Sequence, residues 1–309
     1  MRTGAIAAII TSYNEYPLCL DAVSSVISQD SESLEEIVVV DDGSTDGSPD
    51  ALDAEFSSDR RFTLLRRDNH GLAAARNAGI ALSSSPWIAL LDGDDLWLPG
   101  RLAAVAAAIE SKPDAGVFYS DLNLFTDDHR RHVRARSIEG TGRAARDDYL
   151  RHDAPIIPST ATIRRSVLET VGLFDESLRS AEDTDLWLRI LGQAEAVRIP
   201  RTLVDKRDHP GSLGKRRALK VESMERVVAK AVAADDSLAQ AGRVRMARSQ
   251  IVRCRQAADE GEIGEALRSA LNAVRATPTR RRPWLAVCYG ALVGGVRAAQ
   301  RLARTHGSR

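Results

Sequence analysis

Residues 87–95 read WIALLDGDD, an apolar run that ends in three aspartates within four positions. A short run that is apolar throughout, rather than alternating, predicts a strand covered on both faces, as in a parallel sheet. In open parallel sheets, ligands bind beyond the carboxyl ends of the strands. Asp92, Asp94 and Asp95 therefore stand where a ligand is expected.

Comparable strands alternate with helical patterns on both sides of this run. The strands are predicted over 5–10, 36–41, 62–67, 87–92 and 115–121, and the helices over 18–28, 48–57, 72–83 and 101–111. This order is typical of a Rossmann-like α/β fold with a mostly parallel central sheet flanked by helices. Beyond residue 215 only helical segments are predicted, over 216–234, 239–258, 260–276 and 284–304. We therefore predict an α/β domain over 1–215 and an α-helical region over 216–309.

Charge divides the chain in the same place. The 309 residues have no net charge, but residues 1–215 hold 24 basic and 35 acidic groups and residues 216–309 hold 19 and 8. A basic C-terminal region indicates a phosphate-bearing partner, either nucleic acid or anionic lipid, or else attraction between the two parts. With 43% hydrophobic and 28% charged residues, the chain is expected to be globular.

The sequence offers two interpretations of the C-terminal segment. Residues 283–296 are uncharged but number only 14, short of the roughly 20 that a membrane-spanning helix needs. Flanking arginines would let 284–304 lie on an anionic membrane surface, and an ordinary core helix fits equally well. The three cysteines show no metal or disulfide spacing, and the apolar run at 5–10 is too short for a secretory signal. We expect a cytoplasmic protein, with the membrane option placing it peripherally on the inner face.

Polar motifs follow the predicted strands. TSYNE (11–15) follows the first strand, DDGSTDG (41–47) the second, and HGLAAARNAG (70–79) precedes and enters a helix. Taken alone, DDGSTDG is a turn that caps the next helix, and Arg76 would form a surface ion pair. Three aspartates as close as Asp92, Asp94 and Asp95 repel one another, and a divalent cation with oxygen ligands would relieve that repulsion.

A further acidic motif, SAEDTDLWLR (180–189), opens a predicted helix. Ser180 and Asp183 have the spacing of a capping box, which would give Asp183 a structural role. A carboxylate held ionised at a helix N-terminus is also poised to accept a proton, so catalysis by Asp183 stays open.

Taken in order, TSYNE, VVDDGSTD, GLAAARNAG, LLDGDD, EDTDLWLR and HPGS resemble a family 2 glycosyltransferase of the GT-A fold, inverting and non-processive, over about residues 5–213. The resemblance implies transfer of a sugar from a nucleotide-sugar donor to a glycan or lipid-linked glycan, aided by Mg²⁺ or Mn²⁺. The C-terminal region resembles only the variable helical tails of such enzymes.

The resemblance also implies a role for each matching residue. Asp183 would be the catalytic base. Asp94 would bind the metal, together with His209, although a loop histidine before a proline is by itself more often structural. The residues implied for nucleotide-sugar binding are Thr11, Tyr13, Glu15, Asp42, Arg76, Asp92 and Asp95.

Two other classes of protein fit less well. A nucleotidyltransferase acting on sugar phosphates should have a glycine-rich phosphate loop after the first strand, where TSYNE stands instead. A nucleic-acid-binding protein would explain the basic C-terminal region, but only 5% of residues are aromatic and no stacking motif is present. A nucleotide-sugar binder without activity is disfavoured because every acid that the chemistry needs is present, and no nucleic-acid partner is expected.

Overall fold

A computed structural model of the chain describes residues 4–126, 128–152, 156–208 and 217–278. The chain divides into two compact units, of which the first comprises residues 1–149 and 154–210 and the second residues 150–153 and 211–309.

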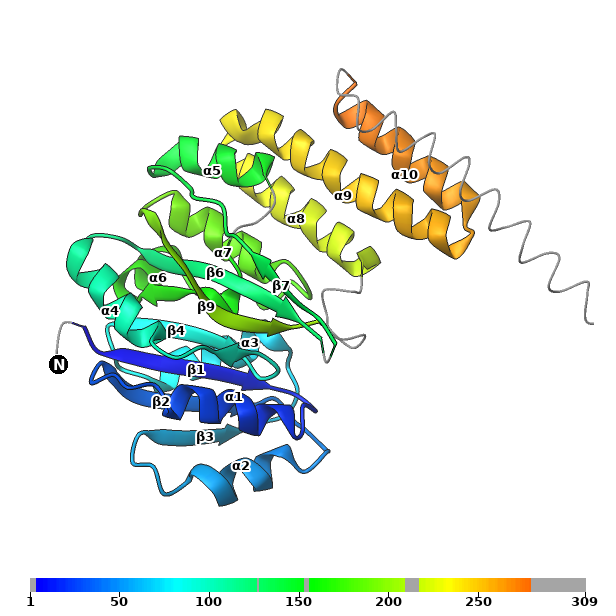
Figure 1. Ribbon diagram of the computed structural model, residues 1–309. Coiled ribbons are helices and arrows are strands. Elements are labelled where there is room, and N and C mark those ends of the chain that lie inside the picture. Colours follow the sequence, from blue (N-terminus) through cyan, green and yellow to red (C-terminus); the bar gives the residue numbers. More distant parts are fainter. Residues whose placement is uncertain (1–3, 127, 153–155, 209–216, 279–309) are drawn as a thin grey trace, which may run out of the picture. The chain divides into compact units, whose positions relative to one another are not determined.

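Among the described residues, the first unit contains one nine-stranded sheet with the order β3-β2-β1-β4-β8-β6-β9-β5, and β7 pairs with β6 beside this path (Figure 1). The strands are β1 (Ile6–Ser12), β2 (Leu34–Asp41), β3 (Phe62–Arg66), β4 (Trp87–Asp92), β5 (Leu96–Trp97), β6 (Val117–Phe125), β7 (Arg130–Val133), β8 (Thr162–Arg164) and β9 (Ala196–Arg207).

The sheet has a parallel half and a mixed half. β3, β2, β1 and β4 run parallel, as their apolar runs predict. The short strand β8 then runs antiparallel to both β4 and β6, while β6 and β9 are parallel to each other. The carboxyl ends of β1, β2 and β4 consequently meet at one edge, where the polar motifs lie.

Helices cover both faces of the parallel half. They are α1 (Leu18–Ile27), α2 (Ser48–Phe56), α3 (Leu72–Leu82) and α4 (Arg101–Ser111). Later in the chain come α5 (Gly142–Arg151), the 3-10 helix η1 (Pro158–Thr160), α6 (Arg165–Val171) and α7 (Glu182–Leu191). These bounds agree closely with the four helices predicted from the sequence before residue 112.

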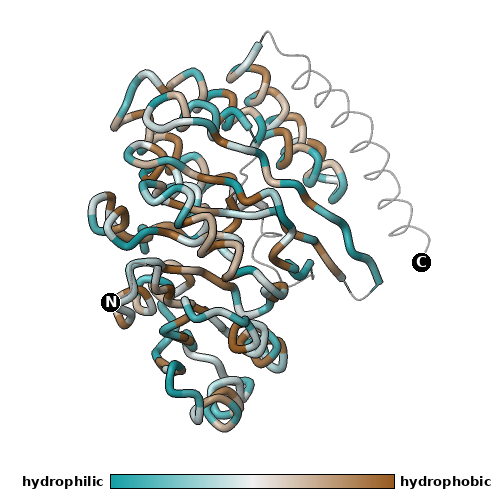
Figure 2. Tube along the Cα trace, turned by 60° about the vertical axis from the view of Figure 1, so that its left-hand side comes forward, coloured by the Kyte–Doolittle hydropathy of each residue, from teal (hydrophilic) through white to brown (hydrophobic). Residues whose placement is uncertain are grey.

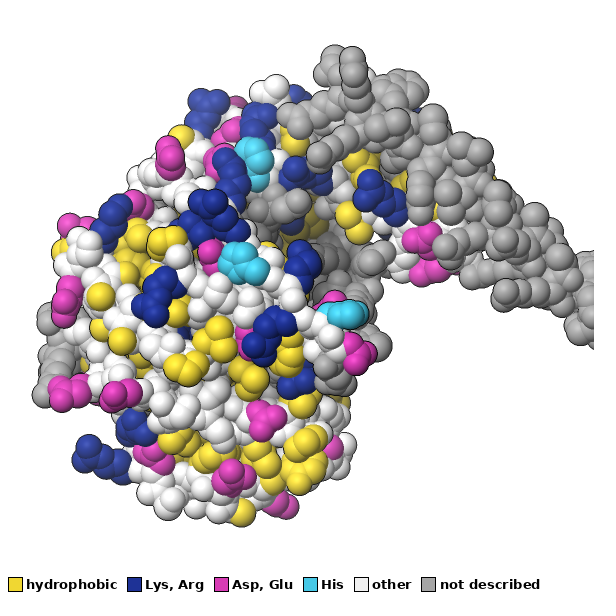
Figure 3. Space-filling model, viewed as in Figure 1, with side chains coloured by type: hydrophobic (Ala, Val, Ile, Leu, Met, Phe, Trp, Pro, Cys, Tyr) yellow, Lys and Arg dark blue, Asp and Glu magenta, His cyan; other side chains and the backbone are white. Residues whose placement is uncertain are grey.

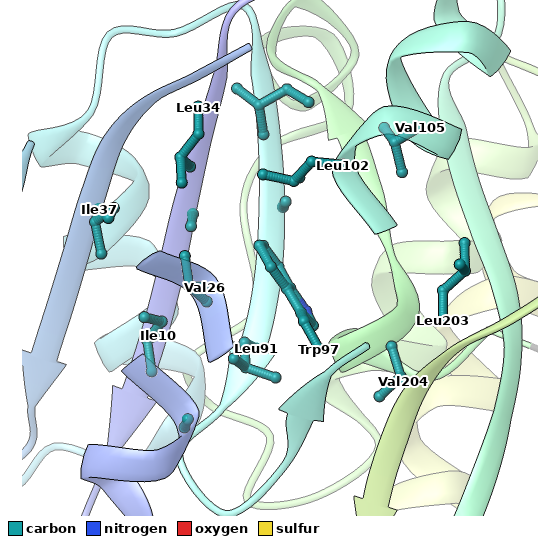
Figure 4. Packing of buried hydrophobic residues seen from close by; sticks show 14 of the residues in the cluster. Ile10, Val26, Leu34, Ile37, Leu91, Trp97, Leu102, Val105, Leu203 and Val204 are labelled. Atoms are coloured by element: carbon teal, nitrogen blue, oxygen red, sulfur yellow. The ribbon is translucent and has the colours of Figure 1, made fainter. Parts of the chain in front are cut away.

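Side chains of β1 alternate between the two faces of the sheet, because successive residues of a strand point in opposite directions. Ile6 and Ile10 belong to a buried cluster that also contains residues of α1, α2 and α4. Ile9 faces α3 instead, where a Cβ added to Gly79 would collide with it. Trp97 of β5 completes the first cluster and lies near Leu91 (Figure 4).

The second unit is helical. Its described elements are α8 (Arg217–Ala234), the 3-10 helix η3 (Asp236–Leu238), α9 (Ala239–Glu260) and α10 (Ile263–Ala276). Gly261 ends α9 with a φ of 77°, a left-handed conformation that glycine adopts without strain. Small side chains such as Ala258 and Ala266 then pack α9 against α10. Hydrophobic and hydrophilic segments alternate along the helices in Figure 2, as expected for amphipathic helices.

Within the described part of the chain, no helix has the length and apolar character needed to cross a membrane. The segment 284–304, for which a membrane-surface helix and a core helix are both predicted, lies outside the described residues.

Candidate active site

The polar edge of the sheet follows directly from strand register. Thr11 pairs with Asp92 of β4, and Ser12 pairs with Asp41 of β2. Because neighbouring strands lie about 4.8 Å apart, the ends of β2 and β4 are separated by only about 10 Å. The backbone N–H of Asp42 donates to the carbonyl of Ser12 at 2.9 Å, which extends this pairing past the end of β2.

Asp92, Asp94 and Asp95 form the acidic cluster of the site. Each offers a carboxylate oxygen, and these oxygens lie within 4.8 Å of one another. Gly93 separates them at a point where the chain passes close to β1, since its N–H donates to the Thr11 carbonyl at 2.9 Å. A Cβ at this position would collide with the carboxylate of Glu15, so glycine allows a fourth acid to approach.

Glu15 is the most perturbed acid of the site. Its Oε2 is buried and has no hydrogen-bond partner within the described structure. Burial, followed by the charges of Asp94 and Asp92, raises the pKa of Glu15 to about 9. The side chain is therefore protonated at neutral pH unless a cation compensates the cluster.

Arg76 joins this edge to α7. Its guanidinium is 2% exposed and donates to Asp92 Oδ1 at 2.7 Å and to Glu182 Oε1 at 2.8 Å. Burial disfavours the charged forms of both Arg76 and Asp92, yet their attraction raises the pKa of Arg76 and, with Lys206, lowers that of Asp92. The surface ion pair expected for Arg76 alone is thus wrong, because α3 points this side chain into the protein between two acids.

Lys206 and Ser159 both contact Asp95 of the acidic cluster. The Lys206 ammonium lies 3.0 Å from Asp95 Oδ2 and 3.6 Å from Asp92 Oδ2. The Ser159 hydroxyl donates to Asp95 Oδ2 at 2.6 Å, and the N–H of Arg207 donates to Asp95 Oδ1 at 2.9 Å. Asp95 is fully buried, and burial raises its pKa to about 7, with Asp92 and Asp94 adding to the rise and Lys206 opposing it.

Asp183 lies in the first turn of α7, next to Glu182. It is half-buried, and its Oδ1 accepts the N–H of Thr184 at 2.6 Å. The capping box predicted for Ser180 and Asp183 is absent from this helix, which is described in full. Ala181 is the N-cap instead, with a left-handed φ of 61° and no side-chain cap. This conformation is unfavourable for alanine, and such strain is common at functional sites.

The residues predicted to bind the nucleotide lie along the same edge, with differing exposure. Asp42 is buried and accepts the N–H groups of Gly71 at 2.8 Å and His70 at 3.2 Å, so that it fixes the start of α3. Thr11 is also buried, and its hydroxyl has no partner among the described residues. Tyr13 is 49% exposed and free to stack on a flat ligand.

The structure brings most of the predicted residues together. His209 lies outside the described residues. Conversely, Glu182, Lys206 and Ser159 belong to the site and were not predicted. Glu182 is the first letter of the ED pair and Lys206 precedes HPGS by three residues, so motif spacing could have indicated both; nothing in the sequence marks Ser159.

Comparison with known proteins identifies the family of this chain. The model of the family described as Glycosyl transferase family 2 matches residues 7–172. The chain belongs to this family. The succinoglycan biosynthesis protein ExoU of Rhizobium meliloti (strain 1021) is 31% identical over 209 residues, covering 63% of this chain and 59% of ExoU. An uncharacterized glycosyltransferase of Rickettsia bellii (strain RML369-C) is 30% identical over 201 residues, covering 62% of this chain and 27% of that protein. The chain thus spans less than two thirds of the length of either relative.

Solved structures confirm the GT-A fold. S. aureus TarS 1-349 in complex with UDP-GlcNAc superimposes with a TM-score of 0.67 at 18% identity, covering 89% of this chain and 82% of that one. The mannosyltransferase PcManGT from Pyrobaculum calidifontis, in complex with GDP-Man and Mn²⁺, gives a TM-score of 0.57 at 21% identity, covering 94% of this chain and 86% of that one. The predicted family and fold class are both confirmed.

The residues present fit a divalent cation. Carboxylate oxygens are the ligands that Mg²⁺ and Mn²⁺ prefer, and Asp92, Asp94 and Asp95 supply them from one short segment. The unpartnered Oε2 of Glu15 adds a further oxygen facing the same cluster. Protein groups also bond to these acids: both oxygens of Asp95 accept hydrogen bonds, and Asp92 Oδ1 accepts one from Arg76.

We predict that Arg76→Met destabilises the protein far more than an equivalent change at the surface. The substitution leaves Asp92 and Glu182 without their buried counter-charge, which should lower the free energy of unfolding by about 3–5 kcal/mol. Arg66→Met is the matched control, because its ion pair with Asp50 is exposed and should contribute about 0–1 kcal/mol. Urea unfolding of the two variants measures both values, and equal losses would contradict the bridging role of Arg76.

Proposed function

We propose that this protein is an inverting glycosyltransferase that moves a sugar from a nucleotide-sugar to a hydroxyl of a glycan or lipid-linked glycan. One observation carries the proposal: a single buried guanidinium, that of Arg76, links the acidic cluster at the end of β4 to the helix turn that carries Asp183. The groups that would bind a donor and the group that would accept a proton are thereby held in one rigid arrangement.

Asp183 is the general base of the proposed reaction. As the acceptor oxygen bonds to the anomeric carbon, its proton passes to Asp183, and the bond from that carbon to the diphosphate breaks with its electron pair leaving on the diphosphate. Attack opposite the leaving group inverts the anomeric carbon. Thr184 keeps one oxygen of Asp183 oriented by its N–H at 2.6 Å, and no described residue donates a hydrogen bond to the other.

Asp94 and Asp92 would hold a divalent cation, and Glu15 faces the same place. When bound, this cation would neutralise charge on the departing diphosphate. Lys206 adds a fixed positive charge beside the cluster, and burial and hydrogen bonds keep Asp95 in one orientation. Asp95 supports the site in this way, and its contact with the nucleotide-sugar stays a prediction. The prediction that His209 is a further ligand stays a prediction.

The donor and acceptor classes are supported by similarity alone. TarS and PcManGT, which share the fold, are described with UDP-GlcNAc and with GDP-Man, and this favours a nucleotide-diphosphate sugar as donor. The relation to a succinoglycan biosynthesis protein favours a growing polysaccharide as acceptor. Such an acceptor is consistent with a cytoplasmic location, with a peripheral position at the membrane for lipid-linked chains.

We predict that at least one UDP- or GDP-sugar stabilises the protein in the presence of Mn²⁺. At a donor concentration near 100 times Kd, the melting temperature should rise by roughly 5–10 °C. Asp94→Ala should abolish the rise, while Asp114→Ala, which removes an exposed loop carboxylate, should keep it. Differential scanning fluorimetry with and without EDTA measures the shift, and an undiminished shift in Asp94→Ala would remove Asp94 from the metal site.

We also predict that Asp183→Asn retains the donor and loses transfer. The amide keeps its oxygen for the Thr184 N–H but cannot take up a proton, so kcat should fall by about 10²–10⁴ while the donor Kd changes less than about twofold. Calorimetric titration of donor and a release assay for the nucleoside diphosphate measure the two quantities. Turnover near that of the unsubstituted enzyme would exclude Asp183 as the base.

A further inference from the structure

Arg101 is a buried cation without a counter-ion. It is the first residue of α4, its side chain is 0% exposed, and no carboxylate of the described chain lies within ion-pairing distance. One terminal nitrogen donates to the carbonyls of Ala161 at 3.3 Å and Ser159 at 3.4 Å, while Nε and the other terminal nitrogen have no hydrogen bond. Arg76, equally buried, is paired with two acids, so Arg101 is the exception.

A buried guanidinium without a counter-ion destabilises the folded protein. Removing a guanidinium from water without an opposite charge is costly, and burial lowers the pKa of Arg101 to about 9, which still leaves it charged at neutral pH. The Trp97 ring, whose centroid lies 4.0 Å from Cζ, offsets part of this by a cation–π contact. A neutral side chain would avoid this desolvation penalty, which indicates that the charge of Arg101 has a role in the residues around it.

Ser159 connects Arg101 to the acidic cluster. Its carbonyl receives hydrogen bonds from Arg101 and from Trp97 Nε1 at 3.2 Å. Its hydroxyl, at the other end of the same residue, donates to Asp95 Oδ2 at 2.6 Å and accepts the N–H of Asp92 at 3.2 Å. Fixing the peptide of Ser159 therefore fixes the hydroxyl that orients both aspartates.

We propose that Arg101 is a positioning residue of the candidate metal site, acting through Ser159 to hold Asp92 and Asp95 in the arrangement that receives the cation. The inference rests on the proposed function, because the cation is the ligand whose affinity it sets. Arg101 is fully buried and bonds to the Ser159 and Ala161 carbonyls rather than to the aspartates. Its charge strengthens the hydrogen bonds to the Ser159 and Ala161 carbonyls, and charge-assisted bonds hold a backbone segment more firmly than neutral ones.

Mn²⁺ affinity, measured by electron paramagnetic resonance without donor or acceptor, tests this in a double-mutant cycle. R101Q and S159A should each weaken Mn²⁺ binding about 10- to 100-fold, as loss of groups that support metal ligands commonly does. In the S159A background R101Q should add less than about twofold, because both changes act through one residue.

Arg164→Gln is the matched control. Arg164 also lies over a tryptophan, with Cζ 5.0 Å from the Trp87 ring, and donates to a carbonyl, that of Ala115 at 3.1 Å, but it does not touch Ser159. Its variant should melt lower and bind Mn²⁺ with unchanged affinity. Should R101Q not fold, R101M takes its place in the cycle, since it is neutral and donates no hydrogen bond.

The Mn²⁺ measurements distinguish failure of the proposed function from failure of the positioning role alone. If the unsubstituted protein binds no Mn²⁺, the proposed function fails together with this inference. If it binds Mn²⁺ and R101Q binds equally well, or more tightly as simple repulsion between cations would give, only the positioning role is overturned. Additive losses in the double variant would also overturn it, because they would show that Arg101 acts independently of Ser159.

Discussion

Repulsion among buried carboxylates is the constraint on which the rest of the site depends. Glu15, Asp92, Asp94 and Asp95 meet at the carboxyl ends of β1 and β4, and Glu182 lies one guanidinium away. Arg76 and Lys206 supply two positive charges, and the remaining acids respond with the raised pKa values of Glu15 and Asp95. A divalent cation at these acids, as proposed above, would complete the compensation.

Local features of the site were predictable from sequence because they depend on neighbours in the chain. The apolar runs at 36–41 and 87–92 gave strands in the expected places, and the aspartates that follow them lie at one edge. The surroundings of Arg76 were not predictable, because its partner Glu182 is 106 residues away in the sequence. The short antiparallel strand Thr162–Arg164 was not predictable for a different reason, because three residues carry no periodic pattern.

Residues of one chemical type have different roles according to what surrounds them. Asp95 is enclosed and bonded through both oxygens, whereas Asp183 is half-buried with one oxygen held by the backbone. The two buried arginines also differ in their surroundings, since Arg76 forms ion pairs with two acids and Arg101 forms none within the described chain. On the face in Figure 3 basic and acidic side chains are interspersed, so charge alone does not mark a docking surface there, and the contacts of individual side chains carry the argument.

The most direct test of the central claim is the position of a manganese ion in crystals grown with a nucleoside diphosphate and Mn²⁺. Anomalous diffraction at the manganese edge should give a peak bonded to a carboxylate oxygen of Asp94, beside Asp92 and facing Glu15, with the nucleotide along the ends of β1 and β2. A well-ordered nucleotide with no manganese at these aspartates, or with manganese bound only by other residues, would contradict the account.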